Sequence, residues 1–236
     1  MSNQAMASIA DVIGTLPFPY PPISLTKHYK GITLNQQGRI MAISPNSVTI
    51  QATQRRTFHC LDGMIHLRSG AFPGAISATI HPIDYTEGTF QLSDLSYSDW
   101  QDRRAERVQP KIPIYATMKF SHKTFRAFME DICTVGMGIL VNSNIDIEGR
   151  LRVGGKLLLD FELTPEFSFT RLTGMVVYRQ KVGQNLIKFG LHLFPSTAQK
   201  IALQNYIIQR HDEILDELEN DSIRMYEPRR VENLYF

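Results

Sequence analysis

Cysteine is scarce in this sequence, which has only Cys60 and Cys133, far apart along the chain. A disulfide framework needs several paired cysteines, so that class of small secreted protein is excluded and a reducing compartment is favoured. Long apolar runs are missing too, because no stretch approaches the roughly 18 to 20 residues that a membrane-spanning helix needs. The first residues also lack the basic-then-apolar pattern of a secretory signal peptide. We therefore expect a cytoplasmic location.

An excess of charge of one sign is lacking as well. The chain has 25 Lys and Arg against 23 Asp and Glu, a formal net charge of +2. Proteins that bind bulk nucleic acid usually carry a strong basic excess, so this balance argues against that class. Hydrophobic residues make up 43% of the chain, which is enough for packed cores. Recognition of an anion must then depend on a local cluster of basic side chains.

Helical periodicity is nearly absent from the first half of the chain. Residues 4–14 can form a short helix, which the four prolines of residues 16–22 must end. After Gly38, short runs alternate polar and apolar residues, with turn pairs such as Asp62-Gly63 between them. This alternation predicts an antiparallel meander or small barrel. The expected strands are 39–43, 47–51, 57–61, 64–69, 75–83 and 89–95.

The second half repeats the β pattern and then becomes helical. Six strands of this length can close a small barrel. A helix is expected from Ser196 or Thr197 to about residue 220, because its apolar residues keep close to one face. Residues 93–102 are polar, lose the alternation, and are predicted to connect the two domains. The expected strands are 112–120, 124–133, 138–141, 156–163, 172–179 and 186–194.

The predicted fold is all-β with a C-terminal helix, built from two small β-barrel domains in tandem. We expect an N-terminal arm with a Pro-rich linker at 1–22 and a first barrel at 23–98. A linker at 99–110 would lead to a six-stranded barrel with its helix at 111–222, and a tail would follow at 223–236. Residues 232–236 look like the start of an engineered protease recognition sequence, and we assign them no function.

Two short motifs carry the chemistry. Arg103, Arg104 and Arg107 place three guanidinium groups within five residues, and such planar forks pair two-pronged with phosphate oxygens or with the edge of guanine. Downstream, Asp131 can accept hydrogen bonds from a base, and Gly136 allows a turn or a close approach of the backbone. Together these residue types indicate a pocket for a guanine-bearing phosphodiester.

The two motifs resemble those of the PilZ domain family, bacterial receptors for cyclic di-GMP. The family motifs are R-x-x-x-R, matched by Arg103 and Arg107, and [D/N]-x-S-x-x-G, matched at its ends by Asp131 and Gly136. Cys133 departs from the pattern because it stands where the family carries Ser. A thiol is a weak donor and acceptor, so the hydrogen bond expected there is weakened. The resemblance covers roughly residues 100–219 and includes the closing strand around Gly190.

The resemblance implies roles for single residues. Arg103 and Arg107 would bond phosphate and the guanine edge, with Arg104 as an auxiliary group, and Asp131 would accept from guanine N–H groups. Cys133 and Gly136 would complete the turn beneath the base. Tyr178, at the end of a strand, either offers an aromatic platform to a base or packs on the helix. Asp102 stands where a basic residue tends to favour a ligand dimer, so one ligand per protomer is expected.

The function implied is that of a cyclic di-GMP receptor with an N-terminal YcgR-like accessory β-domain. Binding at the hinge would reorient the domains and regulate a protein partner in motility, biofilm formation or a related output. Two alternatives remain: a ligand-responsive DNA-binding transcriptional regulator, and a scaffold whose motif no longer binds nucleotide. A homodimer is a further option. The sequence suggests no enzyme, no cofactor and no metal site, because the spacings of His59, Cys60, His66 and His81 match no zinc set.

Overall fold

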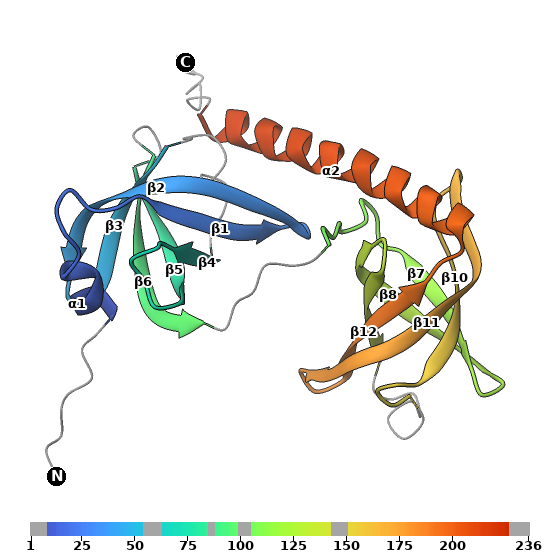
Figure 1. Cartoon of the computed structure of the whole chain (residues 1–236). Helices are drawn as coiled ribbons and strands as arrows, with labels where there is room; N and C mark the ends of the chain where they lie inside the picture. The colour runs from blue at the N-terminus through green and yellow to red at the C-terminus, as the bar shows by residue number, and fades with distance from the viewer. Residues whose placement is uncertain (1–8, 54–62, 85–87, 99–104, 143–150, 227–236) are drawn as a thin grey trace, which may run out of the picture. The chain divides into compact units, whose positions relative to one another are not determined.

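The structure is a computed structural model that describes residues 9–53, 63–84, 88–98, 105–142 and 151–226. Its contacts divide the chain into two compact units. One is built on β1 to β6 and the other on β7 to β12 (Figure 1). The turn Lys30–Ile32 belongs to the second unit, and so do Arg103–Ile214. The predicted fold class is confirmed, since both sheets are closed six-stranded barrels and the long helix is C-terminal.

The first barrel follows a short helix, α1 (Ile9–Gly14). Its strand order is β1-β2-β3-β6-β5-β4, and antiparallel pairing of β1 with β4 closes it. Inward-facing aliphatic side chains from every strand fill the interior, as alternation along a strand requires. The strands are β1 (Ile23–Tyr29), β2 (Ile32–Ser44), β3 (Ser47–Ala52), β4 (Gly63–Arg68), β5 (Ala75–Asp84) and β6 (Thr89–Ser98).

Two expectations for this barrel were wrong. Residues 23–38 were assigned to no strand, whereas they form β1 and the first half of β2. Residues 93–98 were predicted to be part of the connection, whereas they continue β6 and pair with β5. The alternation is interrupted there because the register shifts beside Asp94, whose φ is +53°. The strand expected at 57–61 lies outside the described residues.

The second barrel has the strand order β10-β11-β12-β9-β8-β7, closed by pairing of β10 with β7. All six predicted strands are present, and β11 is longer than expected because it begins at Phe167. Phe169, Phe189, Ile139 and Leu172 lie in its core. The strands are β7 (Tyr115–Phe120), β8 (Lys123–Cys133), β9 (Gly136–Asn142), β10 (Lys156–Thr164), β11 (Phe167–Val182) and β12 (Leu186–Phe194).

The C-terminal helix α2 (Thr197–Tyr226) starts where the sequence predicts. Ser196 Oγ accepts from the Gln199 amide at 3.3 Å, and Gln199 Oε1 accepts from the Ser196 amide at 3.0 Å. This reciprocal arrangement is a capping box, which satisfies two otherwise unpaired donors at the helix start. No helix in the described ranges is long and apolar enough to cross a membrane.

Candidate ligand-binding site

A short segment before β7 carries the end of the arginine motif. Val108 and Ile132 form an isolated antiparallel bridge, with amide-to-carbonyl distances of 2.9 and 3.0 Å. We call residues 105–111 the strap, because they run along the end of β8 that β7 leaves unpaired. Val108 and Ile132 are both fully buried, so alternation turns Arg107 to the outer face of the barrel. The strap thereby brings Arg107 to the β8 strand end.

Arg107 and Asp131 form an ion pair in the second unit. Arg107 Nη1 donates to Asp131 Oδ1 at 3.1 Å, and the Gly138 amide donates to the same oxygen at 3.1 Å. The Asp131 side chain is 13% exposed and the Arg107 side chain is 34% exposed. Both contacts use Oδ1, so neither donor occupies Oδ2. A partly exposed guanidinium therefore lies beside a carboxylate that keeps further acceptor capacity.

The strand register aligns Asp131 with an aromatic ring across four strands. Asp131 of β8 is opposite Gly138 of β9, Gly138 is opposite Gly190 of β12, and Gly190 is opposite Tyr178 of β11. A Cβ on Gly190 would lie 2.3 Å from Tyr178 Cδ1, so the ring covers that glycine. A Cβ on Gly138 would lie 3.0 Å from Asp131 Oδ1. The row thus has a carboxylate at one end, an aromatic ring at the other, and two glycines between.

Cys133 and Gly136 close the turn next to this row. They pair with each other across the β8–β9 hairpin, and Gly136 pairs on its other side with His192. Cys133 is a free cysteine and only 2% exposed. A side chain on Gly136 would approach the Leu191 carbonyl oxygen to 3.2 Å, so a close backbone contact explains the glycine. The buried thiol lies beneath the turn and presents little surface to a ligand.

Further charges surround Tyr178. Lys188 of β12 and Glu130 of β8 form an ion pair with an N–O distance of 2.5 Å. Burial raises the pKa of Tyr178; Glu130 and Asp131 raise it further, while Lys188 and Arg107 lower it. The Tyr178 phenol thus lies in the field of two carboxylates and two cations, whose effects on its pKa oppose one another. Sequence reasoning missed Lys188 and Glu130, although Lys188 is two residues from Gly190 and so on the same strand face.

Helix α2 is anchored to the strap at three points. His211 Nε2 lies 3.3 Å from Glu106 Oε1, and Arg210 Nε donates to the Gln109 carbonyl oxygen at 3.0 Å. Glu213 lies 3.6 Å from Lys111 Nζ. Arg210 is 3% exposed and also pairs with Glu213 at 3.0 Å. The segment that carries Arg107 is therefore fixed to one side of the helix.

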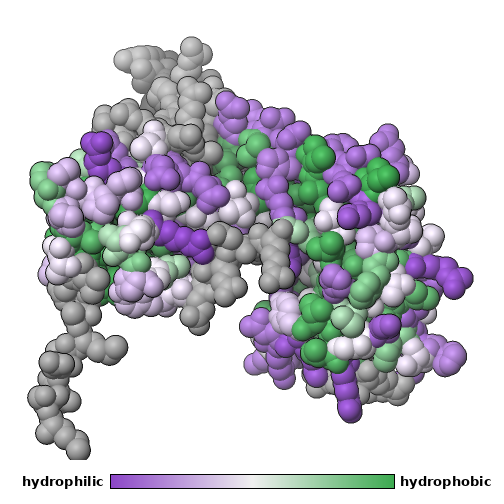
Figure 2. Space-filling model, viewed as in Figure 1, coloured by the Kyte–Doolittle hydropathy of each residue, from purple (hydrophilic) through white to green (hydrophobic). Residues whose placement is uncertain are grey.

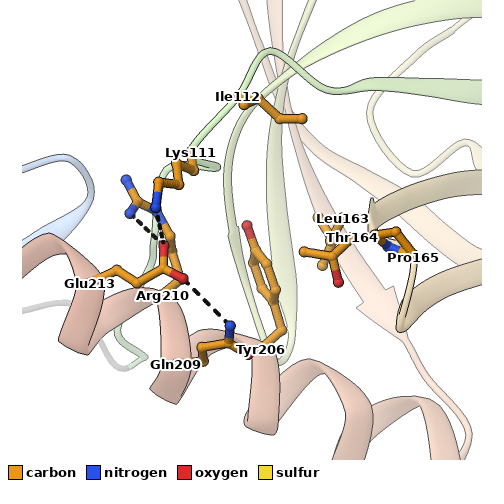
Figure 3. Close-up of a pocket in the computed structure, with 9 residues that line it drawn as sticks. All are labelled: Lys111, Ile112, Leu163, Thr164, Pro165, Tyr206, Gln209, Arg210 and Glu213. Atoms are coloured by element: carbon orange, nitrogen blue, oxygen red, sulfur yellow. Dashed lines mark hydrogen bonds and ion pairs between the residues drawn. The ribbon is translucent and has the colours of Figure 1, made fainter.

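A pocket of about 180 Å³ lies between α2 and the barrel of the second unit (Figure 3). Ile112, Leu163 and Pro165 line its apolar side, and the Arg210–Glu213 pair lines the other. Burial raises the pKa of Tyr206, between them, to about 12. The pocket contains none of the predicted site residues.

Some residues that the sequence analysis singled out lie outside the described ranges. They are Asp102, Arg103 and Arg104 of the arginine motif, and His59 and Cys60, which were considered as metal ligands. Among the described residues, no group of three or more His, Cys, Asp or Glu side chains could hold a metal ion. The structure does bring together Arg107, Asp131, Cys133, Gly136 and Tyr178 on one face of the second barrel.

Comparison with known proteins identifies the domain that carries this site. Residues 101–209 match the family model described as PilZ domain. The chain therefore contains a PilZ domain, as the sequence resemblance predicted. A search of curated proteins found no match.

Solved structures also resemble the chain at low sequence identity. One is YcgR from Escherichia coli in complex with c-di-GMP, with 15% identity, a TM-score of 0.46, and coverage of 90% of this chain and 93% of that one. A K. pneumonia MrkH–c-di-GMP complex has 14% identity and a TM-score of 0.48, with coverage of 91% and 97%. The Bacillus subtilis inhibitor of motility MotI/DgrA has 12% identity and a TM-score of 0.43, with coverage of 82% and 96%.

Proposed function

We propose that this protein is a cytoplasmic receptor for cyclic di-GMP, and not an enzyme. One observation carries the proposal: within a PilZ domain, the Arg107–Asp131 pair stands at one end of a glycine-floored row that ends at Tyr178. A guanine offers N–H donors to a carboxylate and acceptors to a guanidinium, and its flat face can stack on an aromatic ring. Asp131 supplies the carboxylate, Arg107 beside it supplies the guanidinium, and Tyr178 supplies the aromatic ring.

The glycines explain how a flat base could reach the barrel. Side chains on Gly138 and Gly190 would collide with the Asp131 carboxylate and the Tyr178 ring, which lie over these two glycines. Because both positions lack a side chain, the ring can lie over the backbone of β12, and a planar base can stack against it. Asp131 Oδ2 would accept from the guanine edge while Oδ1 keeps the Gly138 amide. Arg107 would turn from Oδ1 to a phosphate or to guanine, with Arg103 and Arg104 completing the grip on the phosphates.

The proposal is tested by replacing Arg107 and measuring affinity by isothermal titration calorimetry. A hydrogen bond to a charged group contributes ~1.5–3 kcal/mol, and ~1.4 kcal/mol changes affinity tenfold. Arg107→Ala should therefore weaken binding of cyclic di-GMP by about one to two orders of magnitude. Arg126→Ala is the matched control, since Arg126 also lies on the outer face of the barrel but stacks over the Tyr115 ring at 4.2 Å. Equal affinities for the two variants would refute the assigned role.

The expected stoichiometry is one ligand per chain. Asp102 precedes the arginine motif, and its carboxylate would repel the phosphates of a second ligand. The same titration gives the ratio directly. A value of two ligands per chain would contradict this part of the proposal.

The contacts of the strap support a route from ligand binding to output. A ligand that draws Arg107 away from Asp131 also pulls on Glu106 and Gln109, which hold His211 and Arg210 of α2. We propose that this changes the relative pose of the two barrels and so regulates a protein partner. A ligand shifts such an equilibrium only by its differential affinity for the two poses. Small-angle scattering should change on adding cyclic di-GMP; identical profiles from a fully bound sample would contradict the reorientation.

A further inference from the structure

A β-bulge in β8 turns two consecutive carboxylates toward the outer face of the second barrel. Met129 is opposite Ile139 and Asp131 is opposite Gly138, so the register shifts at Glu130. Because side chains alternate along a regular strand, only one of Glu130 and Asp131 would otherwise face outward. Instead Met129 is buried, whereas the Glu130 and Asp131 side chains are 32% and 13% exposed. The bulge therefore adds a second carboxylate beside Asp131.

Glu130 reaches across β9 to form an ion pair with Lys188 of β12. Lys188 Nζ lies 2.5 Å from Glu130 Oε2, but this oxygen accepts no well-aligned hydrogen bond from any described residue, so charge rather than direction holds the pair. The two side chains are 27% and 32% exposed, and hydrophobic (green) patches lie between hydrophilic (purple) ones on the second barrel in Figure 2. The pair is therefore accessible to a ligand but only partly hydrated.

This pair and Arg107 flank the row from Asp131 to Tyr178 on opposite sides. Lys188 lies two residues before Gly190 on the same face of β12, whereas Arg107 comes from the side of the β8–β9 turn. Burial is the main cause of the raised pKa of Tyr178, and among the charges nearby Lys188 opposes it most. Tyr178 therefore has a cation and a carboxylate on either side.

A lysine and a glutamate side by side match one edge of guanine. On that edge the O6 acceptor is next to the N1–H donor, so an ammonium can donate to O6 while a carboxylate accepts from N1–H. Adenine reverses the order, because its N6 amino group is a donor and its N1 is an acceptor. The ammonium would then face a donor and the carboxylate an acceptor. Such a pair selects guanine both by attraction and by repulsion of adenine.

We infer that the Lys188–Glu130 pair reads the second guanine of cyclic di-GMP. The inference rests on the proposed function, in which Asp131 takes the edge of one guanine and the other has no assigned contact. Lys188 donates to O6 of this second guanine, and Glu130 accepts from its N1–H. Lys188 has three N–H donors, so it can keep its contact with Glu130 while it binds the base. The two residues therefore determine specificity at one half of the site.

Cyclic GMP–AMP tests the inference, because it keeps one guanine and replaces the other with adenine. Isothermal titration calorimetry of the intact chain should give an affinity for cyclic di-GMP about one to two orders of magnitude higher than for cyclic GMP–AMP. Glu130→Gln should narrow this difference about tenfold, because an amide can donate to N1 of adenine. Glu162→Gln is the matched control, since Glu162 is an exposed carboxylate on β10, and it should leave the difference unchanged.

Lys188→Met tests the other member of the pair. It should weaken binding of cyclic di-GMP about tenfold and leave that of cyclic GMP–AMP nearly unchanged, since only guanine offers an acceptor to the ammonium. Equal affinities of the parent chain for the two ligands, or a difference that either substitution leaves unchanged, overturn the inference while the proposed function stands. A parent chain that does not bind cyclic di-GMP refutes the proposed function, and the inference with it.

Discussion

Gly138 and Gly190 shape the proposed ligand surface at the scale of single residues. A side chain at either position would collide with Asp131 or Tyr178, which lie over the two glycines on the outer face of the second barrel. The Tyr178 ring covers Gly190 itself, and this contact holds the aromatic group over the row. The site therefore depends on the absence of a side chain at Gly138 and Gly190 as well as on the charged residues beside them.

Replacing Gly190 with Ala should displace the Tyr178 ring. The new Cβ would lie 2.3 Å from Cδ1 and 2.6 Å from Cε1 of the ring, which is far inside van der Waals contact. Since stacking of a base on an aromatic ring contributes ~1–3 kcal/mol, we expect about a tenfold loss of affinity for cyclic di-GMP. Gly74→Ala is the control, because nothing lies within 4 Å of a Cβ there. Unchanged affinity in Gly190→Ala would show that Tyr178 does not contact the base.

The motifs in the sequence named Arg107, Asp131, Cys133, Gly136 and Tyr178, but they could not show how these residues are arranged. The alignment of Tyr178 with Asp131 comes from the register of four strands, which includes shifts beside Glu130 and Val177. Such bulges follow from tertiary packing and leave no clear signal in a single sequence. For the same reason the Lys188–Glu130 pair was not predicted.

At the scale of elements, Asp160 joins three strands of the second barrel. Its Oδ1 accepts from the Arg171 amide at 2.6 Å, and Lys119 Nζ of β7 lies 2.5 Å from Oδ2. Asp160 lies where the register between β10 and β11 shifts. The residue across from it, Arg171, has a φ of +51°. The carboxylate thus stabilises this β-bulge, because it accepts a hydrogen bond from the Arg171 amide at the point where the register shifts.

The contribution of Asp160 to stability should depend on pH. The Arg171 amide and Lys119 hold the pKa of Asp160 below its usual value of 3.8. The folded state therefore favours the ionised form, so the stabilisation is complete above the usual pKa and is lost as the pH falls through the lower, folded value. Asp160→Asn should lower the free energy of unfolding at pH 7 by less than about 1 kcal/mol, because the Lys119 side chain is half exposed.

Urea unfolding at two pH values measures this effect. The difference between the parent chain and Asp160→Asn should shrink when the pH falls from 7 to about 2.5, below the usual carboxyl pKa. Glu162→Gln serves as the control, since it removes an exposed carboxylate from the same strand. A difference that stays the same at both pH values would contradict the role assigned to Asp160.

Of the strands in the described ranges, the sequence missed β1 and more than half of β2, and both omissions have a physical explanation. In β1 and β2 the inward positions include Lys27 and Gln36, which are buried but polar. The inward position of Gly38 has no side chain because Leu25 and Ile50 fill that space. Alternation of apolar residues therefore fails in these strands, and a pattern-based prediction cannot find them.

At the scale of the whole molecule, α2 links the proposed ligand site to the rest of the chain. Arg210 and His211 hold the strap that carries Arg107. The helix belongs to both compact units, since residues up to Ile214 are grouped with the second barrel and residues from Leu215 with the first.

The most direct test of the ligand site is an NMR titration of the intact chain, selectively labelled with ¹⁵N-glycine, with cyclic di-GMP. Gly138 lies beside Asp131 and its amide donates to the Asp131 carboxylate, whereas Gly190 lies beneath the Tyr178 ring. Their resonances should shift in a saturable manner, while those of Gly74 and Gly183, in turns away from the row, should not. If Gly138 and Gly190 keep their positions at saturating ligand, the row between Asp131 and Tyr178 is not the binding site.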